Sequence, residues 1–310
     1  MRTVVSIGLS AAILSVEGER PFVLAVAHED GLDALPFGPF DPDRHRTLES
    51  GLRKWVGEQT KFDPGYTEQL YTFGDRGRHL GAGGAREVSV GYLTLTRRIQ
   101  EAPGAQWREW YHYFPWEDWR DARPQMIDSV ILPALRKFAR EAPNPETAEL
   151  RRERINLCFG ESWDEEKVLE RYELLYEAGL VEEFHRDGGG TGTSQPLLGT
   201  AMMFDHRRIL ATAIARLRGK LKYRPVVFEM MAPAFTLLEL QRAVEALAGM
   251  RLHKQNFRRL VAEQGLVEGT GKFASAARGR PAELFRFRRV VLRERPAPGL
   301  RVGARRSRLA

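Results

Sequence analysis

Residues 235–264 read FTLLELQRAVEALAGMRLHKQNFRRLVAEQ, and they contain the clearest structural signals in the last third of the chain. Thr236 stands directly before an apolar-periodic run, and Glu239 follows three residues later. A hydroxyl residue and a glutamate at this spacing form a capping box, which predicts the start of a helix. The run LHKQNFRRLVAEQ predicts a second short helix that ends before Gly265. Two short helices joined by a tight turn are typical of a helix-turn-helix.

The sequence on both sides of these helices predicts the other elements of a winged helix. Residues 205–221 place apolar side chains on one face of an amphipathic helix. This stripe consists of Ile209, Leu210, Ala213, Ile214 and Leu217. We expect a short strand at 224–231 and two strands at 265–271 and 282–289, joined by the Gly- and Arg-rich loop 272–281. Helix, strand, helix, helix and hairpin is the order of a winged helix-turn-helix.

The second short helix is expected to present one buried and one polar face. With successive residues about 100° apart, Phe257, Leu260 and Val261 fall on one side. The opposite side and its flanks carry the small Ala262 and four polar residues: Gln255, Asn256, Arg258 and Arg259. These polar side-chain types can form paired hydrogen bonds with adenine and guanine edges in the major groove of DNA. This face therefore predicts contacts with base edges.

Basic residues near this face suit the DNA backbone. His253 and Lys254 stand at the helix start, where they are better placed for phosphates than for bases. Lys272, Arg278 and Arg280 in the hairpin loop suit a wing that follows the backbone or the minor groove. One such arginine is more often a solvated side chain, so the prediction of double-stranded DNA as partner depends on the whole set.

The charge distribution supports a separate basic module. The net charge of the chain is +7. Residues 205–310 carry 24 Lys and Arg against 8 Asp and Glu, a net charge of +16, whereas residues 1–204 carry 24 against 33, a net charge of −9. A basic third attached to an acidic body is typical of a polyanion-binding module joined to a second function.

Length and cysteine content limit the class of protein. A chain of 310 residues suggests about two domains. The single cysteine, Cys158, excludes an internal disulfide framework and fits the reducing cytoplasm. No apolar run reaches the roughly 18 residues of a membrane span, so we expect no membrane partner. The N-terminal MRTVVSIGLSAAILSV is followed by EGER and the β-rich PFVLAVAHE, which favours a hairpin over a secretory signal.

The rest of the chain divides into a strand-rich and a helical part. Residues 1–100 contain several β-rich runs and one helical run at about 47–60, which indicates an α/β or α+β layer fold. Residues 106–119 hold four of the six tryptophans and suit either a packing cluster or a base-stacking shelf for a nucleotide. Residues 122–184 have helical patterns, with a kink expected at Pro133.

Four segments of the first part resemble a Nudix domain: LPFGPF (35–40), LRKWVGEQTKF (52–62), YTEQLYTFGDRGR (66–78) and VSVGYLTL (88–95). Residues 204–289 resemble the winged-helix part of the Nudix-related transcriptional regulators of NAD metabolism (NadQ/NrtR-type), which is the longer and more specific match. With its helical insertion, the whole chain is similar to a bacterial repressor group for de novo NAD biosynthesis.

The resemblance implies an α+β fold, a Nudix-like α/β/α sandwich with a helical insertion and a C-terminal winged helix-turn-helix domain. The expected parts are an effector-binding domain (1–121), an insertion and linker (122–204), a DNA-binding domain (205–295) and a basic tail (296–310). The resemblance also implies a homodimer on a paired operator half-site and an adenine-nucleotide effector such as ATP, NAD or ADP-ribose. We expect no required cofactor.

The Nudix-like helix lacks the carboxylates that its chemistry needs. Hydrolysis of a pyrophosphate by such a helix requires several carboxylates to hold Mg²⁺. With the family pattern anchored on Arg53, the four glutamate positions fall on His45, Lys54, Gly57 and Glu58, so one carboxylate remains. An ammonium at a metal-ligand position repels the ion. We therefore predict no metal site, no catalytic residue and no enzyme activity.

A pocket that binds a nucleotide without cleaving it suits a sensor. The predicted effector-binding residues are the helix pair Arg53 and Glu58 and three loop arginines, Arg76, Arg78 and Arg86, whose guanidinium groups match phosphate geometry. Such loop arginines are equally often only solvated, and the helix pair can also be a structural ion pair.

Three functions remain open from the sequence. The first is a nucleotide-responsive transcriptional repressor of NAD biosynthesis genes. The second is a Nudix pyrophosphohydrolase with displaced carboxylates that acts on ADP-ribose or a related nucleotide. The third is a structural nucleic-acid-binding protein without a small ligand.

Overall fold

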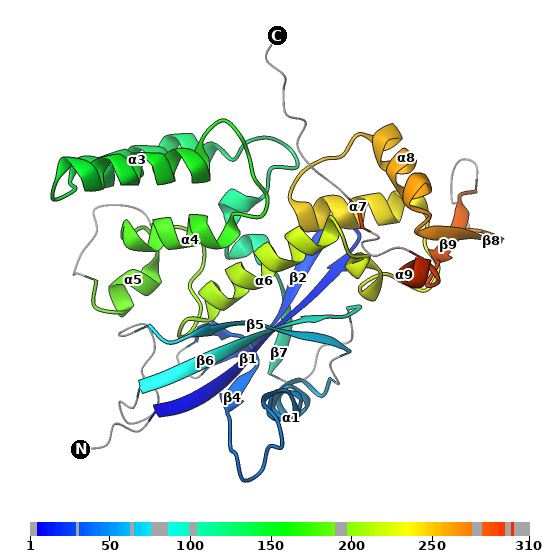
Figure 1. The fold of residues 1–310 in the computed structure, drawn as a ribbon, viewed down its shortest axis with the longest axis horizontal. Coiled ribbons are helices and arrows are strands. Elements are labelled where there is room, and N and C mark those ends of the chain that lie inside the picture. The colour runs from blue at the N-terminus through cyan, green and yellow to red at the C-terminus, as the bar shows by residue number, and fades with distance from the viewer. Residues whose placement is uncertain are drawn as a thin grey trace.

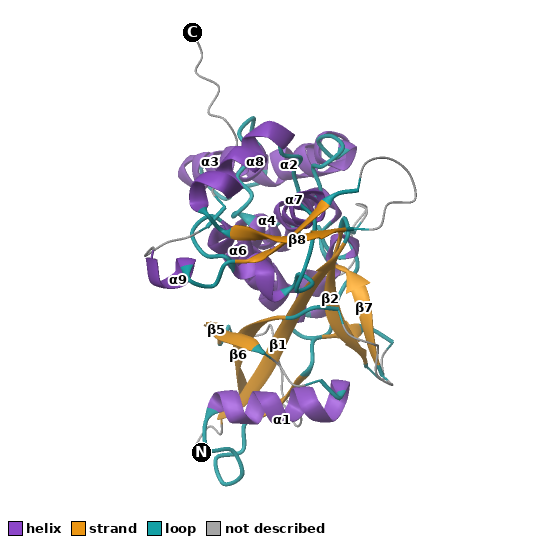
Figure 2. Cartoon of the chain, turned by 90° about the vertical axis from the view of Figure 1, so that its right-hand side faces the viewer, coloured by secondary structure: helices purple, strands orange, loops and turns teal. Residues whose placement is uncertain are grey.

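The computed structural model describes residues 5–28, 31–62, 65–75, 86–98, 104–189, 197–274, 281–294 and 299–300. A twisted sheet lies between α1 (Leu48–Thr60) on one side and a thicker helical layer on the other, and the β8–β9 hairpin projects at one end of that layer (Figures 1 and 2). Among the described helices, none combines the length and the apolar character that a membrane crossing requires. The predicted sandwich with its helical insertion and C-terminal winged helix is confirmed.

The sheet is built around β1 (Val5–Glu17). It pairs antiparallel with β2 (Arg20–Ala27) through a turn at Gly18, whose φ is +60°, and parallel with β6 (Arg86–Leu95). The strand order is β3-β2-β1-β6-β5, with β4 against β1 and β7 against β2. The remaining strands are β3 (Asp33–Ala34), β4 (Phe37–Pro39), β5 (Tyr66–Phe73) and β7 (Ala105–Glu109). The predicted N-terminal hairpin is therefore confirmed.

The two faces of β1 enter two different cores, because successive side chains of a strand point to opposite faces. Leu9, Ala11 and Ile13 pack with Leu52 and Val56 of α1. The alternate residues belong to the larger core on the opposite face; they are Ala12, Leu14 and Val16. A strand buried on both faces appears in sequence as a continuous apolar run rather than as an alternation.

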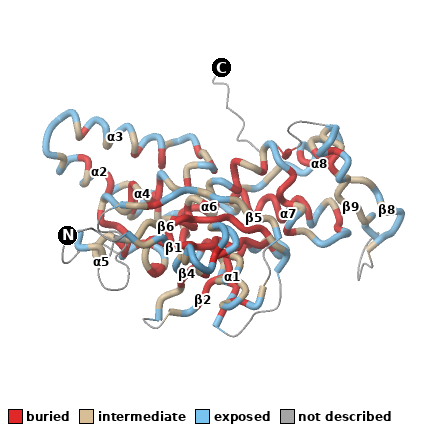
Figure 3. Tube along the Cα trace, turned by 60° about the horizontal axis from the view of Figure 1, so that its bottom comes forward, coloured by how far each residue is buried: buried red, intermediate tan, exposed pale blue. Residues whose placement is uncertain are grey.

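Helix α6 (His206–Leu221) covers the second face of the sheet. It packs against β1, β5 and β6 through its apolar stripe, and the buried residues concentrate where it meets the sheet (Figure 3). At its start, the buried His206 ring accepts a hydrogen bond from the Leu35 backbone N–H at 3.1 Å, and its other nitrogen lies 3.4 Å from the Ser10 hydroxyl of β1. Helix α6, the first element of the basic segment 205–310, therefore packs as part of the sandwich.

The helical insertion forms a layer outside α6. It consists of a π-helical turn (Ile127–Ile131), α2 (Leu132–Arg140), α3 (Pro145–Phe159), α4 (Val168–Glu177) and α5 (Glu182–Arg186). The π-turn directly precedes the helix that contains Pro133. Proline removes a backbone donor from a helix, which accounts for the irregular turn expected there.

The C-terminal module contains the two predicted short helices and the hairpin. Helix α7 (Leu237–Ala248) has the Thr236–Glu239 capping box and ends at Gly249 with φ of +74°; α8 (Lys254–Gln264) ends at the left-handed Gly265. The hairpin pairs β8 (Val267–Phe273) with β9 (Glu283–Phe287), and the short helix α9 spans Val291–Glu294. These sequence predictions are confirmed.

One predicted element of the module is wrong. Residues 224–231 do not form a strand, because Val226–Glu229 form a 3₁₀ helix, η5. Pro225 directly before it has a fixed φ and no donor for a strand ladder, while Val226 and Val227 are buried. A strand position is taken instead by Phe235, which bridges antiparallel to Phe285 of β9.

The aromatic segment is mainly a packing cluster. Trp107 in β7, Trp110 in η2 (Trp110–His112) and Trp116 in η3 (Pro115–Glu117) are at most 6% exposed. Their burial excludes a base-stacking role for these three rings. Trp119 is only partly buried and stacks on Trp163, with ring centres 4.2 Å apart.

A buried ionic cluster joins the parts of the chain, and we refer to Glu117, Arg171 and Arg218 as the Glu117 cluster. Glu117 ends η3, and its carboxylate accepts from Arg171 of α4 at 2.5 and 2.9 Å and from Arg218 of α6 at 2.7 Å. Arg218 also donates to the Leu247 carbonyl at the end of α7, at 2.9 Å. All three charged side chains are at most 1% exposed. The insertion and the helix that covers the sheet therefore meet at one carboxylate, and Arg218 links them to the end of α7.

Two opposite influences act on the pKa of Glu117. Burial raises this pKa, but the guanidinium groups of Arg171 and Arg218 lower it by more than burial raises it. The pKa of Glu117 therefore lies below its ordinary value. The carboxylate is thus ionised in the folded protein. A buried charge is tolerated only with compensating charge and hydrogen bonds, which the two arginines supply.

Replacement of Glu117 by glutamine is expected to lower the free energy of unfolding by about 3 kcal/mol or more, because two buried guanidinium groups lose their counter-charge. Since the folded-state pKa is lowered, the stabilisation is complete above the unfolded-state pKa and is lost as the pH falls through the folded-state value. The difference between wild type and Glu117→Gln should therefore shrink between pH 7 and about pH 3. Urea unfolding at both pH values measures it.

The matched control is Glu177→Gln, because Glu177 forms a similar two-bond pair with a single arginine, Arg154, at 2.6 and 2.9 Å but is exposed. Exposed pairs contribute about 1 kcal/mol or less. Equal losses for the two variants would contradict the special role of the Glu117 cluster.

Candidate functional site

Helix α8 presents its polar residues to solvent. Phe257 and Val261 are 3% and 2% exposed and belong to the main core, and Leu260 packs partly buried beside them. The buried face predicted from the sequence is therefore confirmed. The structure brings the predicted DNA-contacting residues of this helix together on the exposed side; they are Lys254, Gln255, Asn256, Arg258 and Arg259.

The charges on this surface are largely available to a partner. Arg259 pairs with Glu263 one turn later at 3.8 Å, but both side chains are more than 60% exposed, and such a pair contributes little. Lys272 is exposed near the end of β8. Arg278 and Arg280 of the predicted wing lie outside the described residues.

The turn that positions α8 is held by a buried carboxylate. Glu245 of α7 is 4% exposed. Its Oε1 accepts from the Leu252 backbone N–H at 3.0 Å and from the Gln241 amide at 2.8 Å, and its Oε2 accepts from Arg251 at 3.0 Å. Because Arg251 and Leu252 immediately precede α8, these bonds set the direction in which the helix leaves the turn.

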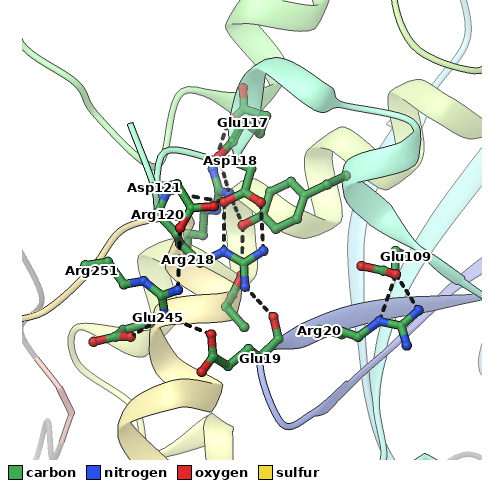
Figure 4. A network of polar contacts seen from close by, with 12 residues as sticks. Glu19, Arg20, Glu109, Glu117, Asp118, Arg120, Asp121, Arg218, Glu245 and Arg251 are labelled. Atoms are coloured by element: carbon green, nitrogen blue, oxygen red, sulfur yellow. Dashed lines mark hydrogen bonds and ion pairs between the residues drawn. The ribbon is translucent and has the colours of Figure 1, made fainter. Parts of the chain in front are cut away.

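The tip of the β1–β2 hairpin contacts this turn directly. Glu19 lies 3.0 Å from Arg251 (Figure 4). It also lies 3.1 Å from Arg242 of α7. The Glu19 carbonyl also accepts from Arg120, whose guanidinium is held by both oxygens of Asp118 at 2.7 Å. The hydrogen bond from Arg251 is the main reason why the pKa of Glu19 is lowered. A central strand pair of the sheet therefore ends at the residues that orient α8.

The four positions of the family pattern lie in different surroundings in and beside α1. His45 is buried at 5% exposure, and its Nδ1 accepts from the Asp41 backbone N–H at 3.1 Å. Lys54 and Glu58 are exposed, and Gly57 offers no side chain. Within the part of the chain that the structure describes, no group of three or more His, Cys, Asp or Glu side chains could hold a metal ion.

Of the predicted effector residues, the structure describes the side chains of Arg53 and Glu58, both on α1. Arg53 pairs with Glu49 at 2.9 Å, because residues four apart lie on one helix face. The effector role of these residues stays a prediction. Arg86 is the first residue of β6, but its side chain lies outside the described residues, as do Arg76 and Arg78.

The contacts around Glu19 were not predicted from the sequence. Glu19 stands in an ordinary hairpin turn, and Arg242 and Arg251 look like solvated helix-end charges. Their sequence separation exceeds 200 residues, so no local spacing indicates the contact. The only available signal is the clustering of charge beside a glycine turn, which is common at protein surfaces.

Two sequence relationships concern the C-terminal module. Residues 227–287, from η5 to the end of β9, match the family model of the NrtR DNA-binding winged helix domain. Over 95 residues the chain is 41% identical to the ADPR responsive transcriptional repressor NtrR of Acinetobacter baylyi, which is 31% of this chain and 38% of that relative. This part of the chain is therefore similar to NrtR-type winged helix domains. The domain start predicted at residue 205 stays a prediction, because the family match begins after α6.

Two solved structures resemble the chain over nearly its whole length. Shewanella oneidensis NrtR, crystallised with a 27mer DNA, has a TM-score of 0.55 over 92% of this chain and 94% of that chain, at 22% identity. A MutT/nudix family protein from Enterococcus faecalis has a TM-score of 0.52 over 93% and 88%, at 14% identity. At these identities the likeness concerns the fold, a Nudix-like sandwich followed by a winged helix.

Proposed function

We propose that the chain is a nucleotide-responsive transcriptional repressor that binds operator DNA through α8 and the β8–β9 wing and regulates genes of NAD biosynthesis. The observation that carries this proposal is the match of residues 227–287 to the NrtR winged helix domain. The exposed polar face of α8 on a segment of net charge +16 supports it. Neutralised phosphates and base-edge contacts are the two components of operator affinity.

ADP-ribose is the effector that we propose, in preference to ATP or NAD. The support is the name of the Acinetobacter baylyi relative, which describes that protein as ADPR responsive. We also propose a homodimer, because a paired operator requires two α8 helices about 34 Å apart or at a multiple of that distance. The predicted effector-binding residues Arg53, Glu58, Arg76, Arg78 and Arg86 remain part of this proposal.

We propose that the Nudix-like domain binds its nucleotide without hydrolysing it. Lys54 and Gly57 stand where the family pattern has glutamates, and Glu58 is exposed on α1. Pyrophosphate hydrolysis needs a metal to neutralise charge in the transition state. A sensor that does not cleave its ligand keeps the signal intact.

We propose that the signal reaches α8 through the hairpin tip. Glu19 joins the β1–β2 turn to Arg251, which is held by Glu245 directly before α8. A ligand changes operator affinity only if it prefers one arrangement of the two α8 helices. A rigid strand pair that ends on the α8 turn can transmit such a preference.

For the DNA contacts, Arg259→Ala and Gln255→Ala are each expected to lose about 1–3 kcal/mol of operator binding while changing binding to random DNA much less, because base-edge contacts carry the specificity. Lys272→Ala should weaken binding to both DNAs and reduce the salt dependence, because it removes a phosphate contact. Fluorescence anisotropy with promoter and scrambled duplexes at several salt concentrations measures both effects. An equal loss on both duplexes for Arg259→Ala would show that α8 does not contact base edges.

For the chemistry, the purified protein should release no AMP from ADP-ribose with Mg²⁺ or Mn²⁺, because its α1 offers one carboxylate at the positions of the family pattern. Chromatographic separation of the nucleotides after prolonged incubation measures this. Turnover that disappears in Glu58→Gln would establish an enzyme and overturn the proposal of a non-catalytic domain.

For the coupling, Glu19→Gln should bring the ratio of operator affinities with and without ADP-ribose closer to one than in wild type, because it removes the charge that ties the hairpin to α8. Glu17→Gln is the matched control, since Glu17 lies on the same hairpin but pairs with Arg98 just beyond β6. Anisotropy titrations of promoter DNA measure the ratio. A Glu19→Gln protein that responds like wild type would exclude this route.

A further inference from the structure

A cavity in the helical insertion lies apart from α1 and α8. It has a volume of about 820 Å³ and is lined by residues of α2 and α3 and by Trp119. Ligand pockets commonly measure about 300–1,000 Å³, so the cavity is large enough for a small organic molecule. The α2–α3 pair forms the outer edge of the insertion layer (Figure 1).

The floor of the cavity is apolar and partly aromatic. Leu132 and Ala139 of α2 face Ile155 and Phe159 of α3 across it. Ala139, Ile155 and Phe159 are themselves buried. Trp119 closes one end, with its ring held by the stack on Trp163 and its indole N–H donating to the Trp116 carbonyl at 3.1 Å. The Arg123 guanidinium also lies over the Trp119 ring, 5.1 Å from its centroid, so an apolar ring system in the cavity would pack on the aliphatic floor beside this wall.

Four arginines also line the cavity, and two of them are already engaged. Arg123 pairs with Asp128 at 3.0 Å and donates to the Phe159 carbonyl at 3.0 Å, while Arg152 pairs with Glu149 at 2.5 Å. Their positions are therefore fixed by the protein.

Arg136 and Arg140 are different. Both line the cavity and are exposed, and neither forms an ion pair or hydrogen bond with any residue that the structure describes. They are four residues apart on α2, so they lie on one face. Two neighbouring guanidinium groups of like charge repel each other unless an anion lies between them. They also stand in residues 1–204, whose net charge is −9, where a local positive surface is unexpected.

We propose that this cavity is a second small-molecule site, which binds an organic anion consisting of a flat apolar ring system and a phosphate or carboxylate group. The ring packs on the floor beside Trp119, and the anionic group is bound by Arg136 and Arg140. Guanidinium groups bind carboxylate and phosphate by paired, charge-assisted hydrogen bonds. The site is separate from the nucleotide pocket proposed for the sandwich.

The test is isothermal titration calorimetry of the full chain with 1-naphthyl phosphate, in the presence of saturating ADP-ribose. We expect saturable binding of one molecule per chain. 1-Naphthoate distinguishes a carboxylate from a phosphate preference. 1-Naphthol, which lacks the anionic group, and inorganic phosphate, which lacks the ring, should each bind at least tenfold more weakly, because each keeps half of the interactions.

The variant Arg136→Gln with Arg140→Gln should weaken binding of the anionic probe at least tenfold and leave binding of 1-naphthol unchanged. Both side chains are exposed, so the variant is expected to fold. Lys137→Gln on the same helix is the matched control, because Lys137 pairs with Glu141 at 3.8 Å and does not line the cavity. The absence of saturable binding, or an affinity unaffected by the double variant, would overturn the proposal.

Discussion

The carboxylate of Glu117 is the point on which the assembly of the chain depends. It is buried at the end of η3 and meets an arginine from the insertion and another from the helix that covers the sheet. Taking three charges out of water is costly, and the cost is offset only when all three are in place and their hydrogen bonds are satisfied. The two arginines satisfy their remaining hydrogen-bond donors by donating to backbone carbonyls of neighbouring segments, including that of Leu247 in α7. One ionic cluster therefore fixes the relative positions of elements that are far apart in sequence.

Two contacts connect the sandwich to the helix-turn-helix. Because Arg218 ties α6 to the end of α7 and Glu19 ties the hairpin to the start of α8, the helix-turn-helix is attached to the sandwich at both of its helices. In the route that we propose, a displacement of the hairpin tip is passed to α8. The two connections differ in burial, since the side chains of the Glu117 cluster are at most 1% exposed while Glu19 is about one-third exposed. The exposed contact is therefore the one that can rearrange.

The sequence predicts those features that depend on local spacing. Capping by Thr236 and Glu239, the glycine end of α8 and the buried face of Phe257 and Val261 follow from helix geometry alone. The strand predicted at 224–231 was wrong because a short apolar run suits a buried helix as well as a strand, and Pro225 decides between them. The Glu19 contacts and the α2–α3 cavity depend on tertiary placement. A single sequence contains no pattern that indicates which charged residues form contacts when they lie more than 200 positions apart.

The central claim is that nucleotide binding in the sandwich and DNA binding at α8 are linked. Linkage requires that each ligand change the affinity of the other by the same factor. The most direct measurement is calorimetry of ADP-ribose binding to the full chain, alone and saturated with its promoter DNA. Clearly different affinities are expected, with a ratio equal to the effect of ADP-ribose on DNA binding. Identical affinities would contradict this linkage and leave a DNA-binding protein that does not respond to the nucleotide.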